Sequence, residues 1–300
     1  MTFEEGVALS RLTTLGTGGP AAAFARPESL DELQEALTWA ADRGLEVAVV
    51  GLGSNLLVAD EGFGGLVVKL GGELAAAEIE GERLVAGGGA ANAVCLHRAR
   101  DAGLGGFEFA CAIPGTVGGG VWMNAGAYGS DWAAILERAL VVDADGSRWL
   151  TPAELGLSYR RSGLRHGQVV ARARFRFVPK AVDEIKATIA ELQALRKAAQ
   201  PTNKRTFGIV FENPDHGLSA GRMLEACGLK GHRIGGAQIS PRHANFIENA
   251  DGARSEDALA LMAEARRRAR EQYGVELEHE VELLGPIVLG GLGGASLDTD

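Results

Sequence analysis

The sequence predicts an α+β fold in two parts, and three observations support this prediction. Short apolar runs alternate with helical patterns as far as about residue 179. An amphipathic helix over 182–199 and a polar break over 200–205 then lead into a smaller α+β region that ends near residue 285. Residues 286–300 surround a Gly-Gly-Leu-Gly-Gly core and have too little bulk for packing. We therefore expect one domain over 1–179, a second over 180–285 and a flexible tail.

Helix and strand signals alternate in the first part. A helix is predicted over 29–44, because Ser29 and Glu32 have the form of a capping box and a glycine suits its C-terminal end. A second helix is predicted over about 91–102. Apolar runs predict strands at 46–50, 65–70, 83–86 and 138–143. Residues 105–130, which are rich in glycine, show neither periodicity.

Two basic patterns need an interpretation. Residues 169–178 alternate as a half-buried strand, with arginines on one face at Arg172, Arg174 and Arg176. This stripe could be an anion-binding surface, but we favour a solvated strand face. The helix predicted over 255–273 has basic residues in its C-terminal half, where they suit the helix dipole. We interpret these as a solvated face, formed by Arg266, Arg267, Arg268 and Arg270.

Composition argues against several classes of partner. The formal charge of 30 − 39 = −9 disfavours nucleic acid, because phosphate binding is built on clustered Lys and Arg. No window approaches the ~20 apolar residues of a membrane span, and the N-terminus lacks the pattern of a secretory signal. Three isolated cysteines predict no disulfide framework. We expect a cytoplasmic protein that binds neither membrane nor nucleic acid, with a monomer as the working expectation.

Motifs for metal and NTPase chemistry are missing. The six histidines form no H-x-x-x-H pair and do not cluster with cysteine, so we expect no metal site. The sequence also has no G-x-x-x-x-G-K-[ST] phosphate loop. An NTPase interpretation therefore loses its main support.

A glycine-rich turn, Gly51-Leu-Gly-Ser-Asn-Leu56, directly follows the strand predicted at 46–50. It lacks the third glycine and the helix of a dinucleotide-binding fingerprint. Its glycines still allow backbone N–H groups to approach a phosphate, and Ser54 and Asn55 add short polar donors. Taken alone, the segment fits a phosphate-contacting turn and an ordinary tight turn equally well.

A second glycine-rich stretch, Ile113-Pro-Gly-Thr-Val-Gly-Gly-Gly120, favours the first of these alternatives. Two separate loops of this kind could hold the two ends of a pyrophosphate. An ordinary turn rarely needs so many glycines together with Asn124. We therefore predict a nucleotide cofactor between the two loops.

Longer motifs carry a specific resemblance. They are Leu15-Gly-Thr-Gly-Gly-Pro20, Val50-Gly-Leu-Gly-Ser-Asn-Leu-Leu-Val-Ala-Asp-Glu-Gly-Phe-Gly-Gly65, Ala112-Ile-Pro-Gly-Thr-Val-Gly-Gly-Gly-Val-Trp-Met-Asn-Ala-Gly-Ala-Tyr-Gly129, Ser158-Tyr-Arg-Arg-Ser162, Ala220-Gly-Arg-Met-Leu-Glu-Ala-Cys-Gly-Leu-Lys-Gly231, His243-Ala-Asn-Phe-Ile-Glu-Asn249 and Leu277-Glu-His-Glu-Val281. In order and spacing, this set resembles the UDP-N-acetylenolpyruvoylglucosamine reductases over about residues 12–285. The short interval between the strand at 169–178 and Phe207 is similar to the family's second subclass, which lacks an inserted substrate loop.

The resemblance implies a fold and a reaction. Residues 1–179 would form a two-part FAD-binding region of the vanillyl-alcohol-oxidase/PCMH type, made of two α/β subdomains, and 180–285 a substrate-binding α+β domain. Members of the family use FAD charged by NADPH to reduce UDP-N-acetylglucosamine enolpyruvate to UDP-N-acetylmuramate. This step belongs to peptidoglycan precursor synthesis, and so to cell-wall biogenesis, cell shape and cell division.

The resemblance also implies site residues at matching positions. The implied cofactor-binding residues are Gly51, Leu52, Gly53, Ser54, Asn55, Leu56, Ile113, Pro114, Gly115, Thr116, Gly118, Gly119, Asn124, Ala125 and Gly126. The implied substrate-binding residues are Tyr159, Asn213, His243 and Asn245. Arg160 matches the catalytic arginine and Glu280 the catalytic glutamate, which we prefer to Glu278 because the family carboxylate directly precedes a valine. Hydride transfer leaves negative charge beside the substrate carboxylate, which fixed donors would stabilise.

The resemblance breaks at the proton donor. The family has a serine, sometimes a cysteine, in a Gly-Ser-x-Phe-Lys-Asn-Pro segment, whereas this chain reads Gly208-Ile-Val-Phe-Glu-Asn-Pro214. Ile209 therefore stands where the hydroxyl is expected, and Glu212 replaces the usual lysine. Either a water or a nearby hydroxyl such as Thr206 delivers the proton, or reduction is slowed within the ~10²–10⁴-fold range of general acid catalysis.

Two other functions stay open at this point. One is a related FAD oxidoreductase with a changed substrate, supported by the missing serine, although Arg160, Glu280, His243 and Asn245 argue against it. The other is a flavin or UDP-sugar binding protein whose turnover is impaired.

Overall fold

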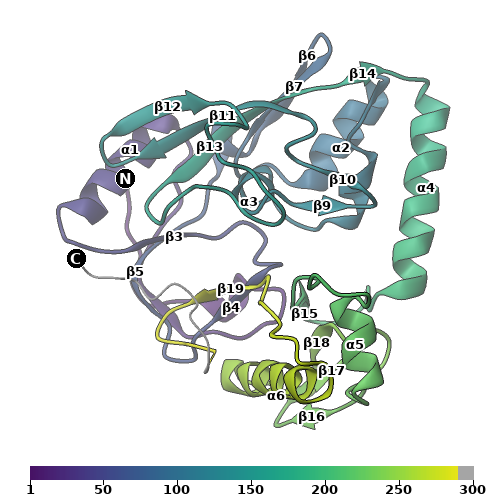
Figure 1. The fold of residues 1–300 in the computed structure, drawn as a ribbon. Helices are drawn as coiled ribbons and strands as arrows, with labels where there is room; N and C mark the ends of the chain where they lie inside the picture. Colours follow the sequence, from purple (N-terminus) through teal and green to yellow (C-terminus); the bar gives the residue numbers. More distant parts are fainter. Residues whose placement is uncertain (290–300) are drawn as a thin grey trace.

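The structure is a computed structural model that describes residues 1–289, and it has the predicted α+β class. Figure 1 shows helix α4 (Val182–Ala199) at the edge of the molecule, running from the strands near the top of the view toward the region that holds α5 and α6. The bounds of α4 agree with the helix predicted from the sequence. Sheets of four, five and four strands organise the rest of the described chain.

The first four-stranded sheet along the sequence has the strand order β1-β2-β5-β3, and its strands are parallel except for β1. Its strands are β1 (Val7–Ala8), β2 (Pro20–Ala25), β3 (Val47–Val49) and β5 (Phe63–Val68). Helix α1 (Leu30–Ala41) buries its apolar face between this sheet and the five-stranded one. Ser29 caps α1 by accepting a 3.2 Å hydrogen bond from the Glu32 N–H, as the capping-box pattern predicts.

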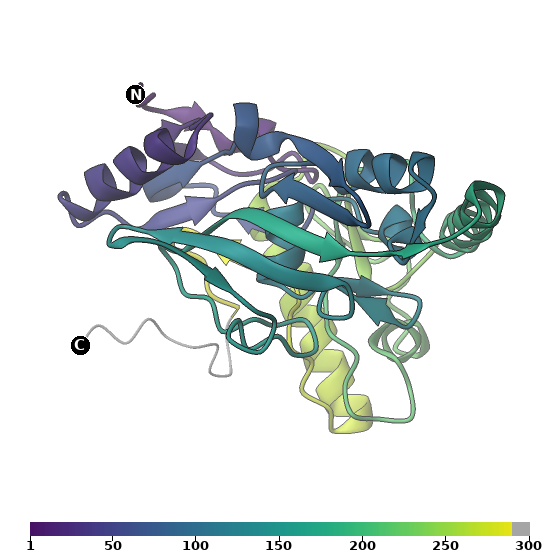
Figure 2. The same ribbon diagram turned by 90° about the horizontal axis from the view of Figure 1, so that it is seen from above.

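The five-stranded sheet is antiparallel, with the order β12-β11-β13-β7-β6, and it crosses the molecule in Figure 2. Its strands are β6 (Ala77–Glu80), β7 (Arg83–Gly87), β11 (Leu136–Asp143), β12 (Gly146–Leu150) and β13 (Val169–Arg176). Helices α2 (Asn92–Asp101) and α3 (Val117–Trp122) pack on it around an aromatic core. Phe107 lies at the centre of this core, with ring centroids 5.3 Å from Trp132 and 5.9 Å from Phe175.

The arginine stripe of β13 faces carboxylates. The pairs are Arg172 with Glu73, Arg174 with Glu80 and Arg176 with Glu137, at 3.2, 3.6 and 3.8 Å. Because each guanidinium has a partner from a neighbouring segment, the structure favours the solvated, ion-paired face over an anion-binding surface.

The last sheet has the order β15-β18-β17-β16 and carries α5 (Ala220–Ala226) and α6 (Ser255–Tyr273). Its strands are β15 (Thr206–Ile209), β16 (Arg233–Ile234), β17 (Ala237–Ile239) and β18 (Phe246–Asn249). Leu15 and Leu57, from the start of the chain, are buried in its core. The Asp60 carboxylate accepts hydrogen bonds of 3.0 Å from both the Ser255 and the Glu256 N–H, so a residue of the first part caps α6.

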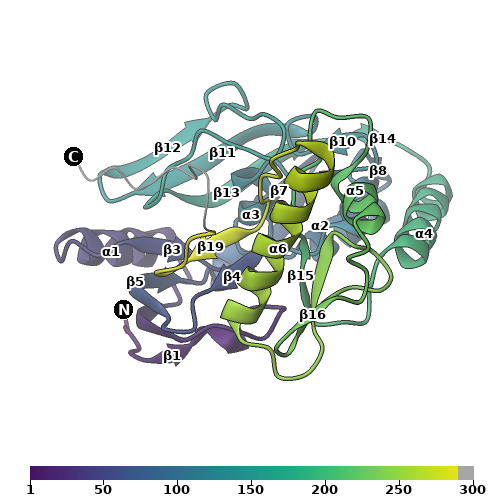
Figure 3. The ribbon, with the colours of Figure 1, turned by 60° about the horizontal axis from the view of Figure 1, so that its bottom comes forward.

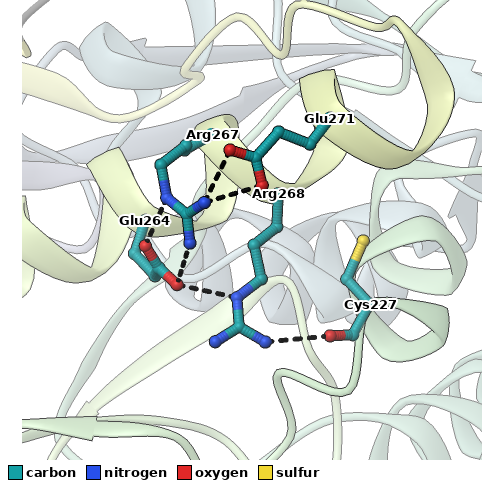
Figure 4. Close-up of polar contacts among 5 residues, drawn as sticks. All are labelled: Cys227, Glu264, Arg267, Arg268 and Glu271. Carbon is teal, nitrogen blue, oxygen red and sulfur yellow. Dashed lines mark hydrogen bonds and ion pairs between the residues drawn. The ribbon is translucent and has the colours of Figure 1, made fainter.

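The basic run of α6 is tied down by acidic neighbours (Figure 4). Arg267 lies between Glu264 and Glu271, at 2.8 and 2.6 Å. Arg268 contacts Glu264 at 2.7 Å and donates a 3.3 Å hydrogen bond to the carbonyl of Cys227, the residue that follows α5. Arg267 and Arg270 therefore lie on a solvated helix face, as predicted, whereas the Arg266 side chain is only 12% exposed and Arg268 joins α6 to α5.

The end of the described chain returns to its beginning. Strand β19 (Glu282–Leu284) pairs in parallel with β4 (Leu56–Val58), beside α6 in Figure 3. Leu289 is buried in the core of the last sheet and Ile287 packs against it, whereas Pro286 and Val288 are exposed; residues 290–300 lie outside the described residues. The shorter elements are η1 (Leu9–Arg11), η2 (Gly72–Ala75), β8 (Leu104–Gly105), η3 (Glu108–Ala112), β9 (Gly126–Ala127), β10 (Ser130–Asp131) and β14 (Val178–Pro179).

Within residues 1–289, no helix combines the length and the apolar character needed to cross a bilayer.

Candidate active site

A cavity of about 360 Å³ lies between the two glycine-rich loops. Every residue of the predicted first loop lines it, from Gly51 to Leu56. From the second loop come Ile113, Pro114, Gly115, Thr116, Gly118, Gly119 and Ala125. Two residues predicted to bind cofactor, Asn124 and Gly126, are not part of the lining. The structure thus brings together two segments some sixty residues apart, as expected for two loops that hold a pyrophosphate.

Close backbone contacts explain the glycines of the first loop. Gly53 has φ +64°, and a Cβ there would lie 2.0 Å from the Leu12 carbonyl oxygen. The Gly53 carbonyl in turn accepts a 3.0 Å hydrogen bond from the Thr14 N–H. A side chain at Gly53 would be unfavourable in this backbone conformation and would clash with the backbone of Leu12.

The two loops also touch each other directly. The Ser54 hydroxyl donates a 2.6 Å hydrogen bond to the Pro114 carbonyl. A Cβ built on Gly51 would lie 2.4 Å from the Thr116 hydroxyl oxygen. The width of the cavity at this point therefore depends on the absence of a side chain at Gly51.

Several lining residues were not predicted from the sequence. They include Arg26, Lys69, Asn92, His166 and Gln168. Lys69 donates a short hydrogen bond to the Gly51 carbonyl, and burial, followed by the charge of Arg26, lowers the pKa of its ammonium group. Arg26 and Lys69 lie outside the glycine motifs, directly after strands β2 and β5. Only the folded structure, which brings them to the cavity, identifies them as part of this site.

The lining fits the FAD that the resemblance implies. Asn92 is buried and its Oδ1 has no hydrogen-bond partner, while its Nδ2 donates to the Ile113 carbonyl at 3.1 Å. An unpartnered buried acceptor at a cavity wall is costly unless a ligand donor satisfies it. The glycine loops allow close backbone approach, and Arg26 and Lys69 supply positive charge for a pyrophosphate. The donors present therefore suit a dinucleotide with an anionic centre.

The predicted catalytic pair lies together next to this cavity. The Arg160 Nε is 3.3 Å from Oε1 of Glu280, and both side chains are largely buried. Arg160 Nη2 donates to the Gly126 carbonyl at 2.8 Å, and its guanidinium lies 5.0 Å from the ring of Tyr159. The Nε–H is buried and, apart from this ion pair, has no hydrogen-bond partner.

Asn124 and Gly126 hold the arginine segment instead of lining the cavity. Asn124 donates to the Ser158 carbonyl at 2.8 Å and accepts from the Ala133 N–H at 2.9 Å. Arg160 itself has φ +57°, an unfavourable conformation for a residue with a side chain. In this structure the two residues therefore help to impose the conformation that directs Arg160 toward Glu280.

Asn55 connects the cavity to the catalytic pair. The side-chain amide of Asn55 donates a 2.9 Å hydrogen bond to the backbone carbonyl of Glu280. The backbone carbonyl of Asn55 accepts a 3.1 Å hydrogen bond from the Glu282 N–H. The first glycine-rich loop and the segment that carries the glutamate are thus fixed to each other.

Glu280 sits in an environment that disfavours its charge. Burial raises the pKa of its carboxyl group above the ordinary range, opposed by Arg160 and reinforced by the nearby carboxylate of Glu212. The pKa of Glu212 is also raised, first by burial and then by Glu278, against the charge of Arg161. Perturbed carboxyls of this kind are typical of sites that transfer protons.

Three of the predicted substrate-binding residues have structural partners. Asn245 holds both backbone groups of Phe211, accepting from its N–H at 3.0 Å and donating to its carbonyl at 2.8 Å. Asn213 accepts a 3.1 Å bond from the Ala220 N–H at the start of α5. His243 packs against Gly221, and burial lowers the pKa of its imidazole.

Tyr159 is more accessible than these three, because the residue is 53% exposed although its ring contacts the Arg160 guanidinium.

Ile209 lies at the end of β15, paired with Phe246 of β18. The preceding Gly208 approaches the first glycine-rich loop, since a Cβ there would lie 3.2 Å from the Ser54 carbonyl oxygen. The Thr206 hydroxyl accepts a 3.3 Å hydrogen bond from the Gly208 N–H and remains a candidate donor. Ile209, which stands where the family motif has a serine, thus follows a residue that approaches the first loop, but it is not part of the cavity lining.

Comparisons with known proteins agree with this geometry. Residues 200–284 match the family model described as the C-terminal domain of UDP-N-acetylenolpyruvoylglucosamine reductase, and residues 21–151 match an FAD binding domain. The reductase of Rubrobacter xylanophilus is 44% identical over 279 residues, covering 92% of this chain and 93% of that protein. The reductase of Bacillus subtilis is 40% identical over 282 residues, covering 92% of each.

A solved structure is similar over the whole fold. The UDP-N-acetylenolpyruvylglucosamine reductase of Thermus caldophilus superposes with a TM-score of 0.84 at 38% identity, covering 95% of this chain and 100% of that one. The likeness extends through both matched regions, so it supports the cofactor-binding and the C-terminal halves together.

Proposed function

This chain belongs to the UDP-N-acetylenolpyruvoylglucosamine reductase family, and from this premise we propose that it reduces UDP-N-acetylglucosamine enolpyruvate to UDP-N-acetylmuramate with FAD as cofactor and NADPH as reductant. The observation that carries the proposal is the contact of Arg160 with Glu280 beside the cavity between the glycine-rich loops. The reaction places the protein in peptidoglycan precursor synthesis, and we assign it to the cytoplasm, as a monomer, with roles in cell shape and division.

We assign the cavity to FAD, with both glycine-rich loops as its principal contacts. FAD bound there would supply the hydride for the reduction, after being reduced by NADPH. Asn92 is assigned to a donor group of the cofactor, because its Oδ1 is buried and unpartnered. Arg26 and Lys69, which also line the cavity, would offset the charge of its pyrophosphate.

Arg160 is assigned to the carboxylate of the enolpyruvyl group. Negative charge develops on the carbon next to this carboxylate during reduction, and a fixed guanidinium stabilises that charge more than it stabilises the ground state. The hydrogen bond to Gly126 and the contact with Glu280 hold the guanidinium in place before substrate binds. Tyr159, exposed beside Arg160, is assigned to substrate, with Asn213, His243 and Asn245 shaping the surrounding segments.

The division into a cofactor domain over 1–179 and a substrate domain over 180–285 is part of the proposal. It is supported by the separate core of the last sheet and by the long connecting helix α4. Leu15, Leu57 and Asp60 bridge the two regions, because the two leucines are buried in the core of the last sheet and Asp60 accepts hydrogen bonds from the start of α6.

Flavin absorbance tests the function directly. We expect the purified protein to bind FAD, to lose its absorbance near the flavin maximum when NADPH is added without oxygen, and to regain it when the enolpyruvyl substrate is added. Loss without recovery would favour an oxidoreductase with another substrate or a binding protein without turnover. A protein unable to take up FAD would refute the proposal altogether.

A further inference from the structure

The segment that carries the catalytic glutamate lies against the segment that lacks the serine. Phe211 and His279 form an antiparallel bridge, with the Glu212 N–H bonded to the Glu278 carbonyl at 2.9 Å and the Glu280 N–H bonded to the Val210 carbonyl at 2.8 Å. Alternate residues of paired strands share a face. The side chains of Glu212, Glu278 and Glu280 therefore lie on one face.

Two adjacent arginines meet these three carboxylates. Arg160 contacts Glu280 at 3.3 Å, while Arg161 contacts Glu212 at 3.8 Å and also reaches Glu278. The carboxylates thus outnumber the guanidinium groups. Glu280 and Glu212 are nearly enclosed, with side chains 12% and 16% exposed, whereas Glu278 is 68% exposed. The negative charge that the two arginines do not balance therefore lies on the two enclosed carboxyls, Glu212 and Glu280.

The hydroxyl that the family uses is missing at the same place. Ile209 directly precedes Val210, whose carbonyl holds the Glu280 N–H. Glu212, three residues later, occupies the position at which the family usually has a lysine. The loss of a proton donor and the gain of a carboxyl therefore occur within one short segment that contacts Glu280.

We propose that Glu212 is the positioning residue that keeps a proton on Glu280, so that Glu280 protonates the substrate in this serine-less site. This inference rests on the proposed function. Hydride addition at one carbon of the double bond leaves an electron pair on the carbon next to the substrate carboxylate. The Glu280 O–H bond breaks as that carbon forms its new C–H bond, which leaves a Glu280 carboxylate. Glu280 recovers a proton from water before the next turnover.

Electrostatics supports this assignment. Two like charges on neighbouring groups cannot both form cheaply, so a carboxyl pair retains a proton to higher pH. Diagonal neighbours across paired strands lie roughly 7 Å apart, and two unit charges at that distance near a protein surface shift a pKa by about one to two units. The groups that face the pair are Arg160 on Glu280, and Arg161, Glu278, Arg160 and His279 on Glu212. Removal of the Glu212 charge is therefore expected to lower the pKa of Glu280.

The test is the pH profile of proton delivery in Glu212→Gln. FAD-loaded enzyme is reduced with NADPH and mixed without oxygen with the enolpyruvyl substrate between pH 5 and 9, and flavin reoxidation is followed in a single turnover. We expect the alkaline fall in rate to move about one pH unit lower, which gives about tenfold slower reoxidation at high pH and little change at pH 5. Glu278→Gln is the matched control, because it removes an exposed carboxylate from the same face and the same arginine. Glu278 acts on Glu280 only through Glu212, so its profile should move much less than that of Glu212→Gln.

Two results would overturn the proposal. One is a pH profile of Glu212→Gln that has the same shape as that of wild type. This holds also if the rate is reduced equally at every pH, because such a result would mean that Glu212 only holds Arg161 in place. The other is a failure of Ile209→Ser to restore the alkaline rate in the Glu212→Gln background, because a hydroxyl at that position should bypass the carboxyl pair. Wild-type enzyme that is not reoxidised by substrate at any pH would instead refute the proposed function itself.

Discussion

The contact between the two glycine-rich loops gives a sharp test of the cofactor site. In Gly51→Ala, the new Cβ would lie 2.4 Å from the Thr116 hydroxyl oxygen and 3.0 Å from its Cγ2. Ordinary van der Waals contact begins near 3.4 Å, so the loops must separate by about 1 Å. Gly51 does not have a positive φ, so alanine adds no backbone strain of its own. The variant thus changes the spacing of the loops and little else.

The expected result is weaker FAD binding. A displacement of about 1 Å lengthens at least one hydrogen bond to the cofactor, which is worth ~1–1.5 kcal/mol. This corresponds to roughly tenfold in the dissociation constant. Titration of the apoprotein with FAD, followed by the quenching of flavin fluorescence, measures it. Gly64→Ala is the matched control, because a Cβ at Gly64 meets nothing within 4 Å and the position lies in β5, away from the cavity.

A second substitution separates spacing from other causes. In Gly51→Ala combined with Thr116→Ala, the atoms that made the closest contacts are gone, and the nearest remaining atom is the Cβ of residue 116 at 3.3 Å. The double variant should therefore bind FAD no more weakly than Thr116→Ala alone. Unchanged affinity in Gly51→Ala, or a double variant in which the two losses simply add, would refute the reasoning that the loops are spaced by this contact.

Three further perturbations have defined outcomes. Glu280→Gln should abolish substrate-driven reoxidation. Its melting temperature relative to that of wild type should increase as pH rises above the ordinary carboxyl pKa, because a carboxyl whose pKa is raised in the folded state destabilises that state as it ionises. Asp60→Ala should lower the free energy of unfolding in urea by ~1–2 kcal/mol, with Asp60→Asn losing less, because only one of the two bonds that cap α6 need be lost. Arg160→Lys should slow single-turnover reduction at least tenfold at unchanged FAD affinity, because lysine cannot serve Gly126 and the substrate carboxylate together.

Regular elements were predictable where local chemistry decides the structure. The helices predicted over 182–199 and 255–273 appear as α4 and α6 with the same bounds. Their periodicity, acidic first turns and, for α6, a left-handed Gly274 at the C-terminus all agree with one another. The strand predicted over 169–178 appears as β13, slightly shorter. The patterns that predict these elements are local, although α6 also receives a cap from Asp60 and β13 pairs with β7 and β11.

Helix α3 was missed because distant contacts determine it. Three consecutive glycines, which disfavour helix, occupy its centre. A Cβ at Gly120 would lie 2.4 Å from the Trp132 ring, and one at Gly118 would lie 3.0 Å from the Gly88 carbonyl oxygen. The helix is therefore stabilised by packing that only glycine permits, and no periodicity in residues 105–130 could reveal it.

The candidate site was predictable as two loops but not as a cavity. The glycine motifs identified 51–56 and 113–119, all of whose named residues line the cavity. Asn92, Arg26 and Lys69 reach the same walls from segments without any motif. Conversely, Asn124 lies inside a motif yet holds the backbone of the arginine segment. A motif indicates that a residue belongs to the site, whereas its contacts in the folded structure show whether it lines the cavity or holds a neighbouring segment.

The position of Glu280 shows why the site tolerates a change in its proton donor. The glutamate is fixed by Asn55 from the cofactor loop and by Val210 from the segment of Ile209, and neither contact uses the side chain at position 209. Replacing a hydroxyl by isoleucine therefore removes a proton but leaves the carboxyl and Arg160 in place. A second carboxyl at Glu212 can then change the protonation of Glu280 through charge alone, without moving any backbone. Proton delivery is thus the part of this site that can change while the cofactor loops and the arginine stay as they are.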